Sequence, residues 1–592
     1  MRRLWPRLDL VQVLALAAIL FPAAAVHPQS SDQNKPGVLR LSTKLVTLSV
    51  VVTDAQGHPI RDLSKDDFTL LDGGKPQQID FFNPVDVSVP RSAAPLPPDT
   101  YTNRPQDYGA LPSVTVLLFD ALNSRWTSQG YSLHRMRTFL RHLQPQDRLG
   151  IYVLSDDLIV VHNVARDSSD ILAAIHRYDE RHSPGDKSKA DSHPESSSDR
   201  ILNDFISGKD THYRFELSSD TTLPGSFPPA LSGYATAKLE FAASMTVASV
   251  EAITRELSGV PGRKSLIWVT DGIGLLGSFE QDDLRDYILR WQGVPTRELS
   301  AAPPWLNGRD VERLIRQLND GGVVVYTVDS RGLETMDLGF RTSAPSAAGL
   351  VSSSPAEDVT AATPKPNPDL LELSKRTGGR SFFNHNDLET GLQQALNDSQ
   401  FSYSLAYYPT HNQWKGAWRK IQVRVNRPGA AVLSRAGYFA LPDAAPGTPK
   451  DRIEFLTEVA ASPIDSTALP LRVQLAARNT EGPTRLDARV HVDPAPLLVT
   501  QSNGHSTANT EILFMQIGDK GKLLNATQKS VDADLSPEEF SAAVQKGWDI
   551  PVELTLLPGA DYLCVILHDY RTDEVGSVRI PLARYATSPA AR

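Results

Sequence analysis

Cysteine is almost absent from this chain, which has one, Cys564, in 592 residues. A single thiol excludes an intrachain disulfide and any metal site built from several cysteines. Basic residues are also in deficit, with 60 Lys and Arg against 69 Asp and Glu and a formal net charge of −9. This balance argues against nucleic-acid binding, because nucleic-acid-binding proteins present a basic face to phosphates. Beyond the N-terminus no run of about 18 apolar residues occurs, so we expect no transmembrane segment in the mature chain.

The N-terminus has the three parts of a secretory signal peptide. Arg2, Arg3 and Arg7 form a basic region, residues 10–21 are apolar, and residues 23–25 are small alanines suited to cleavage. An uncleaved N-terminal anchor is the alternative, but the apolar run is short for a bilayer span. We therefore predict that residues 1–25 are removed near Ala25 and that the mature protein is extracytoplasmic, either periplasmic or secreted.

The chain is long enough for several domains, about three or four at the usual domain size. Residues 38–85 alternate apolar and polar positions and predict a small N-terminal β module. Within this module, Asp72-Gly-Gly-Lys75 indicates a hairpin between residues 68–71 and 79–82. The Pro-rich stretch 86–112 that follows predicts a linker.

From Ser113 strands alternate with helical patterns as far as residue 400. This rhythm predicts an α/β domain with a doubly wound, mostly parallel sheet. Residues 159–161 are expected to form an antiparallel edge strand of that sheet. Two stretches rich in small and polar residues, 181–233 and 336–367, predict excursions from the domain.

Strand patterns return at 401–440 and, after a predicted linker at 441–450, continue over residues 451–592. The spacing of the short strands in the last segment predicts a C-terminal β-sandwich of immunoglobulin-like type. Because β character stops before the α/β domain and resumes after it, we hypothesise that strands within 38–82 and 402–439 pair into one sandwich. A structure without contact between those two segments would rule this hypothesis out.

The strand predicted at 113–120 ends on an acid, Asp120, and Ser124 follows within four residues. A second buried strand, at 264–270, ends on Thr270 and is followed by Asp271. Loops beyond the carboxyl ends of strands are where open α/β sheets bind ligands. Carboxylate and hydroxyl oxygens there are also the ligand types that Mg²⁺ takes.

The order of elements together with these residues resembles the von Willebrand factor type A (VWA) domain. The resemblance implies a metal-ion-dependent adhesion site, with Asp120 as its first Asp, Ser124 as its last Ser and Asp271 as its distal Asp. Two members of the family pattern are missing. Leu122 stands where the pattern has a middle Ser, and residues 164–167, where we expect the loop that carries a Thr, contain none.

Four further strings resemble one subgroup, the VWFA-related proteins known mainly from acidobacteria. They are residues 51–68 (VVTDAQGHPIRDLSKDDF), 377–382 (TGGRSF), 403–409 (YSLAYYP) and 435–438 (RAGY). The resemblance covers roughly residues 38–440 and rests on the ordered set of strings. It implies a secreted protein without established catalytic activity, whose VWA domain binds other proteins.

Two interpretations of the acids stay open. In one, Asp120, Ser124 and Asp271 hold Mg²⁺, or Mn²⁺ or Ca²⁺, with Asn123 or Ser168 as a substitute oxygen ligand. In the other, Asp120 and Asp271 hydrogen-bond backbone amides at helix starts and no metal is bound. A nearby Arg166 could even replace the charge of the cation.

Gly272-Ile-Gly-Leu-Leu-Gly277 has the form of a dinucleotide-binding motif, but that motif needs an acid about 20 residues on. The next clear strand end, Asp329, is too far away, so we predict a glycine-rich turn. No H-E-x-x-H, C-x-x-C or G-x-S-x-G occurs, and an enzyme is the least favoured class. The favoured class is a module that binds an unidentified protein ligand through the sheet-top loops. The alternative is a metal-independent scaffold whose β modules carry the interactions.

Overall fold

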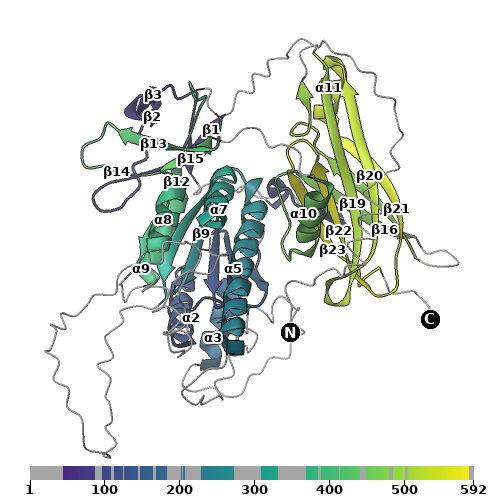
Figure 1. Ribbon diagram of the computed structural model, residues 1–592, viewed down its shortest axis with the longest axis horizontal. Coiled ribbons are helices and arrows are strands. Elements are labelled where there is room, and N and C mark those ends of the chain that lie inside the picture. The colour runs from purple at the N-terminus through teal and green to yellow at the C-terminus, as the bar shows by residue number, and fades with distance from the viewer. Residues whose placement is uncertain are drawn as a thin grey trace, which may run out of the picture.

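Three folded units make up the described part of the chain (Figure 1). The computed structural model describes residues 45–86, 96–108, 113–124, 126–144, 147–164, 168–182, 202, 205–206, 229–271, 308–330, 368–383, 388–411, 414–440, 448–478, 484–500 and 504–585. The predicted signal peptide lies outside these residues. Of the helices in the described ranges, none is both long enough and apolar enough to cross a membrane.

Strands from both sides of the α/β segment combine into one two-sheet unit, which we call the first sandwich. In one sheet β1 pairs antiparallel with β12, with Val46 opposite Tyr407, and in the other β2 pairs antiparallel with β13. The contact that the sandwich hypothesis required is therefore present. The sheet orders are β14-β1-β12-β4 and β15-β13-β2-β3. The strands are β1 (Val46–Thr53), β2 (Phe68–Asp72), β3 (Lys75–Gln77), β4 (Phe81–Asp86), β12 (Phe401–Tyr407), β13 (Ala417–Val425), β14 (Ala431–Leu433) and β15 (Gly437–Ala440).

The predicted hairpin at Asp72-Gly-Gly-Lys75 is present, but its second strand is not the predicted one. Gly73 and Gly74 have φ angles of 56° and 82°, the left-handed values that a two-residue hairpin turn requires. They join β2 to the short β3, whereas β4, which contains the second half of the predicted 79–82 strand, crosses to the other sheet and pairs with β12. β4 thus forms the edge strand of the β14-β1-β12-β4 sheet and not a partner of β2.

Two residues of the subgroup strings, Tyr407 and Tyr438, meet in a buried polar cluster of the first sandwich. The carboxylate of Asp72 is fully buried and accepts hydrogen bonds from the hydroxyls of Tyr407 and Tyr438, each at 3.0 Å. Arg419 Nε donates to the other Asp72 oxygen at 2.8 Å. A buried carboxylate needs such partners, so Tyr407 and Tyr438 have a structural role here.

The central unit is a six-stranded sheet in the order β11-β10-β9-β6-β7-β8. Its neighbours are parallel except for β8, which runs antiparallel to β7 at the edge, as the sequence predicted. The strands are β6 (Ser113–Asp120), β7 (Leu149–Leu154), β8 (Leu158–His162), β9 (Arg263–Thr270), β10 (Val323–Asp329) and β11 (Ser381–Phe382), and the helices are α2 (Trp126–Leu140), α3 (Ser169–His182), α5 (Pro229–Ser258), α7 (Gly308–Asp320), α8 (Pro368–Thr377) and α9 (Leu388–Gln400).

Helices cover both faces of this sheet, and every residue of β6 is buried. Alternate residues of the strands pack into two cores, one containing residues of α5, α7 and α8 and the other containing residues of α2, α3 and α9. Burial on both faces explains why these strands are continuous apolar runs. The predicted α/β class is thus confirmed.

The predicted excursions fall mostly outside the described residues. Of 181–233, Leu202, Phe205 and Ile206 are described and are buried in the core beside α2 and α3. The long helix α5 begins at Pro229, inside the predicted excursion. Residues 336–367 lie outside the described residues.

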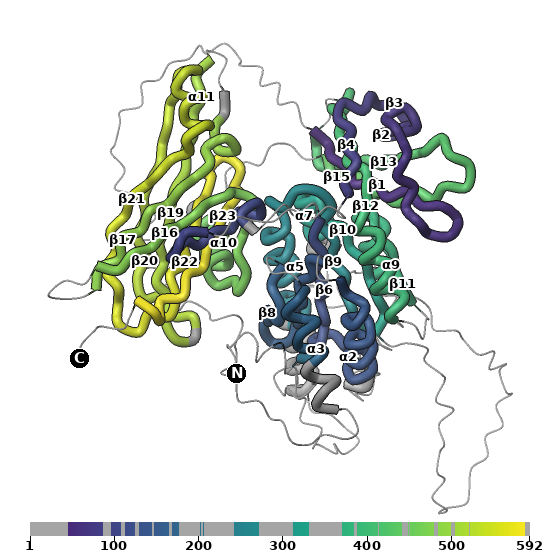
Figure 2. The backbone as a smooth tube through the Cα atoms, turned by 180° about the vertical axis from the view of Figure 1, so that it is seen from behind, coloured from purple at the N-terminus to yellow at the C-terminus, as the bar shows by residue number. Residues whose placement is uncertain are grey.

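The first sandwich covers the amino-terminal edge of the central sheet (Figure 2). Arg263, the first residue of β9, donates to Ser49 Oγ at 3.0 Å. Arg435 donates to the backbone oxygen of Asn319, just before β10, also at 3.0 Å. The carboxyl ends of the parallel strands therefore point away from the first sandwich.

The C-terminal unit consists of two antiparallel sheets that share one core. One sheet has the order β21-β17-β16-β5, and the other has the order β18-β19-β22-β23 with β20 paired to β19. Helix α10 (Pro449–Ala461) covers the outer face of the second sheet. The strands are β5 (Thr100–Thr102), β16 (Leu471–Arg478), β17 (Arg485–Val492), β18 (Val499–Thr500), β19 (Ser506–Gly518), β20 (Lys522–Leu535), β21 (Trp548–Thr555), β22 (Ala560–Asp569) and β23 (Val575–Pro581).

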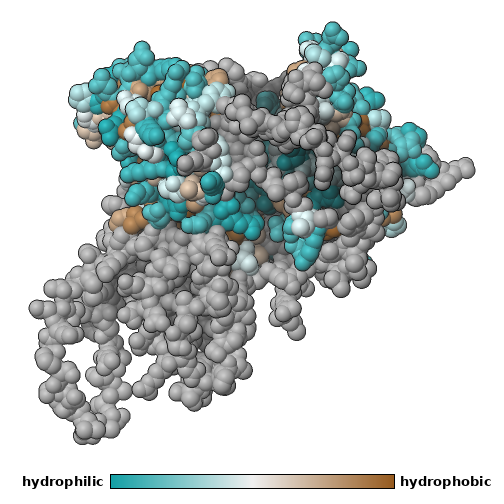
Figure 3. Space-filling model, turned by 45° about the horizontal axis from the view of Figure 1, so that its top comes forward, coloured by the Kyte–Doolittle hydropathy of each residue, from teal (hydrophilic) through white to brown (hydrophobic). Residues whose placement is uncertain are grey.

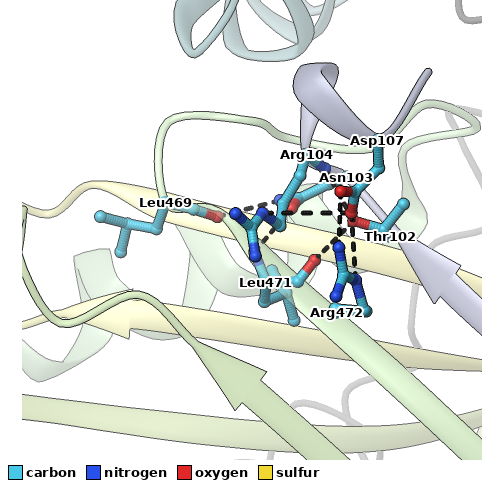
Figure 4. Close-up of polar contacts among 7 residues, drawn as sticks. All are labelled: Thr102, Asn103, Arg104, Asp107, Leu469, Leu471 and Arg472. Atoms are coloured by element: carbon cyan, nitrogen blue, oxygen red, sulfur yellow. Dashed lines mark hydrogen bonds and ion pairs between the residues drawn. The ribbon is translucent and has the colours of Figure 1, made fainter. Parts of the chain in front are cut away.

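Both predicted linkers need correction. Within 86–112, strand β5 pairs with β16 of the C-terminal unit, and the short helix η2 (Pro105–Tyr108) follows it. Within 441–450, α10 starts at Pro449 behind the N-cap Thr448. Hydrogen bonds specify both deviations. Asn103 after β5 binds the backbone of Leu469 and Leu471 (Figure 4), and the Thr448 hydroxyl accepts from the Asp451 N–H at the start of α10.

Candidate functional site

The candidate site lies at the carboxyl edge of the central sheet, where strand order reverses. β6 and β9 are neighbours, but the chain continues from β6 to α2 on one face and from β9 toward α7 on the other. Such a reversal leaves a crevice between the two strand ends, which is the general ligand position in doubly wound sheets. Asp120 ends β6 and Asp271 directly follows β9, so the two predicted acids flank this point.

Asp120 is buried, and donors surround its carboxylate. Asn123 donates from its backbone N–H to Oδ1 at 2.9 Å, and its side-chain amide lies 3.0 and 2.8 Å from the two oxygens. Trp268 Nε1 donates to Oδ2 at 3.0 Å. The Asn123 amide also donates to Thr246 Oγ1 on α5 at 2.9 Å, which fixes its orientation. Both Asp120 oxygens therefore already have protein partners.

Burial raises the pKa of Asp120 to about 6, while the hydrogen bonds from Asn123, Trp268 and Thr270 hold it lower than burial alone would. A buried carboxylate without a cation is costly, and donors offset part of that cost. Asp120 is therefore largely ionised at pH 7 and neutral in mild acid.

Ser124 and Asp271 do come together, and Ser330 joins them. The backbone N–H of Asp271 donates to Ser124 Oγ at 3.2 Å, and the Ser330 hydroxyl lies 3.4 Å from that of Ser124. The Ser330 hydroxyl donates to Asp271 Oδ1. Ser330 follows β10 and is held in place because its backbone N–H donates to Thr270 O at 3.1 Å. Three strand ends thus contribute to one polar cluster, which we call the switch-point cluster.

The two departures from the family pattern have different structural reasons. Leu122 is buried in the core on the α5 side of the sheet, so an apolar side chain is required there. Of the predicted Thr-bearing loop at 164–167, residues 165–167 lie outside the described residues. β8 runs antiparallel and returns the chain to the amino edge, where Ser168 donates to Asp147 O at 2.7 Å, just before β7. Ser168 is therefore not a substitute ligand; Arg166 lies outside the described residues.

Trp268, Thr246 and Ser330 were missed as site residues. Trp268 lies in an apolar strand and Thr246 lies within a long helix, so nothing in the sequence separates them from core residues. Ser330 could have been found. It follows a third parallel strand at the same edge, as Ser124 and Asp271 follow the first two.

The donor set does not fit a resident metal ion. The Asp120 oxygens accept from Asn123 and Trp268, and the Ser124 hydroxyl accepts from the Asp271 amide. Mg²⁺ needs near-octahedral oxygen ligands whose lone pairs are available to it. In the described ranges, no group of three or more His, Cys, Asp or Glu side chains is arranged to hold a metal.

The glycine motif at 272–277 lies outside the described residues, so only its preceding acid, Asp271, is placed. No protein-family model and no curated protein matches this chain.

Proposed function

We propose that this chain is an extracytoplasmic binding protein of VWA type that takes a protein ligand at the carboxyl edge of its central sheet. One observation carries the proposal. The switch-point cluster gathers polar groups from three strand ends at the sheet edge opposite the first sandwich. Secretion follows from the predicted signal peptide, the C-terminal unit is taken to be immunoglobulin-like, and no reaction is assigned to the cluster.

The proposed binding does not use a metal. In a VWA-type adhesion site the ion is expected to receive an acidic side chain from the partner. Here the donors around Asp120 occupy the oxygens that such an ion would need. The partner is proposed to meet the exposed rim of this edge, which includes Asp156 after β7 and the partly exposed Asp271 after β9.

The alternative function, a scaffold that binds through its β modules, has one supporting observation. Phe81 and Tyr408 are 54% and 42% exposed, and their ring centroids lie 6.3 Å apart on the first sandwich. Leu45, 45% exposed, lies at the same end of the same sheet. Elsewhere, on the face shown in Figure 3, the coloured surface is mostly hydrophilic with small hydrophobic patches.

A matched pair of double variants separates the two functions. The full chain is immobilised and exposed to the extracytoplasmic fraction in buffer with EDTA. Asp156→Lys with Asp271→Lys is expected to abolish capture of a specific protein, whereas Phe81→Ser with Tyr408→Ser leaves capture unchanged. The reverse pattern supports the scaffold. Capture that needs Mg²⁺ contradicts the metal-free proposal.

A further inference from the structure

The C-terminal end of α5 and the segment 462–467 form a tight contact between the central and C-terminal units, which we call the α5 joint. Thr467 makes three hydrogen bonds across this joint. Its backbone N–H donates to Arg255 O at 3.1 Å, and its hydroxyl donates to Glu256 O at 2.5 Å and accepts from Gly259 N at 2.8 Å. Ile464 packs into the core of the central unit. Figures 1 and 2 both place α5 beside α10 and the C-terminal sheets.

The side chain of Glu256 is enclosed in this joint, with 4% of the residue exposed. Among the described residues, the hydrogen-bond partner of its carboxyl group is the Tyr152 hydroxyl on β7, which lies 2.7 Å from both carboxyl oxygens. A phenol has one proton, so it cannot make two full hydrogen bonds as a donor. A proton on the carboxyl supplies the second bond. The geometry thus suits the neutral acid.

No cation compensates Glu256 within the described part of the chain. Arg313 on α7 pairs with Glu251 at 3.1 Å, and Arg579 donates to the backbone oxygens of Ala460 and Ser462. Asp465 adds negative potential from the C-terminal unit. The titratable and charged groups around the joint are Tyr152 on β7, Glu251 and Arg255 on α5, Arg313 on α7, Glu458 on α10, Asp465 in the segment, Cys564 on β22 and Arg579 on β23.

We propose that the α5 joint is a pH-dependent domain contact that the protonated carboxyl of Glu256 closes and that ionisation of this carboxyl loosens. Ionisation places a negative charge opposite Asp465 in a water-poor contact with no cation to pair with it. The charge is relieved when the joint opens and water reaches the carboxylate.

Burial raises the pKa of Glu256 to about 8 and that of Asp465 to about 7, well above the ordinary values of 4.5 and 3.8 for these side chains. A closed-state pKa above the open-state pKa means that protonation favours closure. The contact is therefore tightest below the open-state value and loosens as pH rises toward 8. Between the open-state pKa and the closed-state pKa, each such carboxyl raises the equilibrium constant for opening about tenfold per pH unit. Above the closed-state pKa this constant no longer changes with pH.

Hydrogen exchange of the full chain between pH 6 and 9, corrected for intrinsic rates, tests the proposal. Protection of amides in 253–259 and 464–469 is expected to fall at least about tenfold per pH unit up to pH 8 in the wild type. Glu256→Gln, a neutral isostere, is expected to flatten this dependence between pH 7 and 8, where Asp465, with a pKa of about 7, is already largely ionised. Glu251→Gln removes an acid of the same helix that already has a cation, and it is expected to keep the wild-type slope.

Equal slopes in wild type and Glu256→Gln overturn the proposal, as does equal flattening by Glu251→Gln. Tyr152→Phe gives a second test if the Gln variant does not fold. Removing the phenol takes away the side-chain hydrogen-bond partner of both forms of the Glu256 carboxyl, so the pH at which loosening levels off should shift from the wild-type value. An unchanged levelling point in Tyr152→Phe also contradicts the proposal.

Discussion

Asp120 illustrates how one residue type serves two chemistries that a sequence pattern does not separate. An acid at the end of a buried strand can coordinate a metal or accept hydrogen bonds from its own fold. Here Asn123 and Trp268 supply the donors, and the carboxylate is completely buried. The decisive partner, Trp268, comes from a neighbouring strand, so the chemistry of Asp120 depends on tertiary structure.

The raised pKa of Asp120 makes a pH prediction. A folded-state pKa of about 6 against an ordinary value of 3.8 means that the native state loses stability as pH rises from about 4 to about 6. Asp120→Asn lacks this loss, so between pH 4 and 7 wild-type stability should fall relative to the variant by up to about 3 kcal/mol. The difference is measured by urea unfolding, with hydrogen exchange of the β6 amides as the readout. Asp66→Asn, on an exposed helical turn, serves as control, and parallel pH profiles for Asp120→Asn and wild type count against the assignment.

A substitution at Gly259 tests the α5 joint by adding a single side-chain carbon. A Cβ at this position would lie 1.9 Å from the backbone oxygen of Thr467, a contact that neither backbone can accommodate unmoved. Gly259→Ala is therefore expected to weaken the joint by about 1–3 kcal/mol, seen as lost hydrogen-exchange protection in 464–469. Gly130 in α2 has open space around it. Gly130→Ala should stabilise its helix by about 0.5–1 kcal/mol, and a similar loss in both variants would contradict the steric argument.

Among the helices and strands, those that could be predicted are the ones whose own residues are apolar enough to indicate burial. β6, β7, β9 and β10 are continuous apolar runs, and the strands predicted at 113–120 and 264–270 match β6 and β9 to within one residue. α10 and α11 (Pro537–Lys546) were missed although Thr448 and Ser536 form capping boxes with Asp451 and Glu539. β5 and β20 lack a local signal, because β5 is three residues long and β20 is largely exposed.

The attachment of β5 to the C-terminal unit is a testable consequence. The Asn103 side chain donates to Leu469 O and accepts from Leu471 N (Figure 4), and it also donates to Ser466 O; all three bonds are buried. Asn103→Ala removes these three hydrogen bonds, although Ser466 O keeps the Ser577 N–H, and should lower the free energy of opening of β16, measured by hydrogen exchange, by about 2–4 kcal/mol. Arg478→Ala breaks exposed ion pairs at the other end of β16 and should cost less than about 1 kcal/mol. Equal effects would show that β5 is only loosely attached.

At the scale of the whole molecule, the arrangement of the units is what gives the carboxyl edge its importance. The first sandwich is assembled from segments on both sides of the central unit and covers the amino edge, and the α5 joint attaches the C-terminal unit. The hypothesis of a split sandwich needed only the order of patterns along the chain. The joint could not be predicted, because Thr467 and Glu256 meet only when the central and C-terminal units pack together.

Divalent cations should leave the stability of the molecule unchanged. A site held at 100 times its dissociation constant would add about 2.7 kcal/mol to the unfolding free energy and raise the melting temperature. Thermal unfolding in EDTA and in millimolar Mg²⁺ is therefore expected to coincide, in the wild type and in Asp271→Ala alike. A rise with Mg²⁺ in the wild type that Asp271→Ala abolishes would restore the metal site.

Site-specific photo-crosslinking tests the central claim most directly. A photoreactive amino acid is placed at position 271 at the sheet edge or at position 81 on the first sandwich, and the full chain is irradiated with its extracytoplasmic fraction in EDTA. The account predicts one specific protein adduct from position 271 and none from position 81. An adduct only from position 81, or one from position 271 that forms only with Mg²⁺, would contradict it.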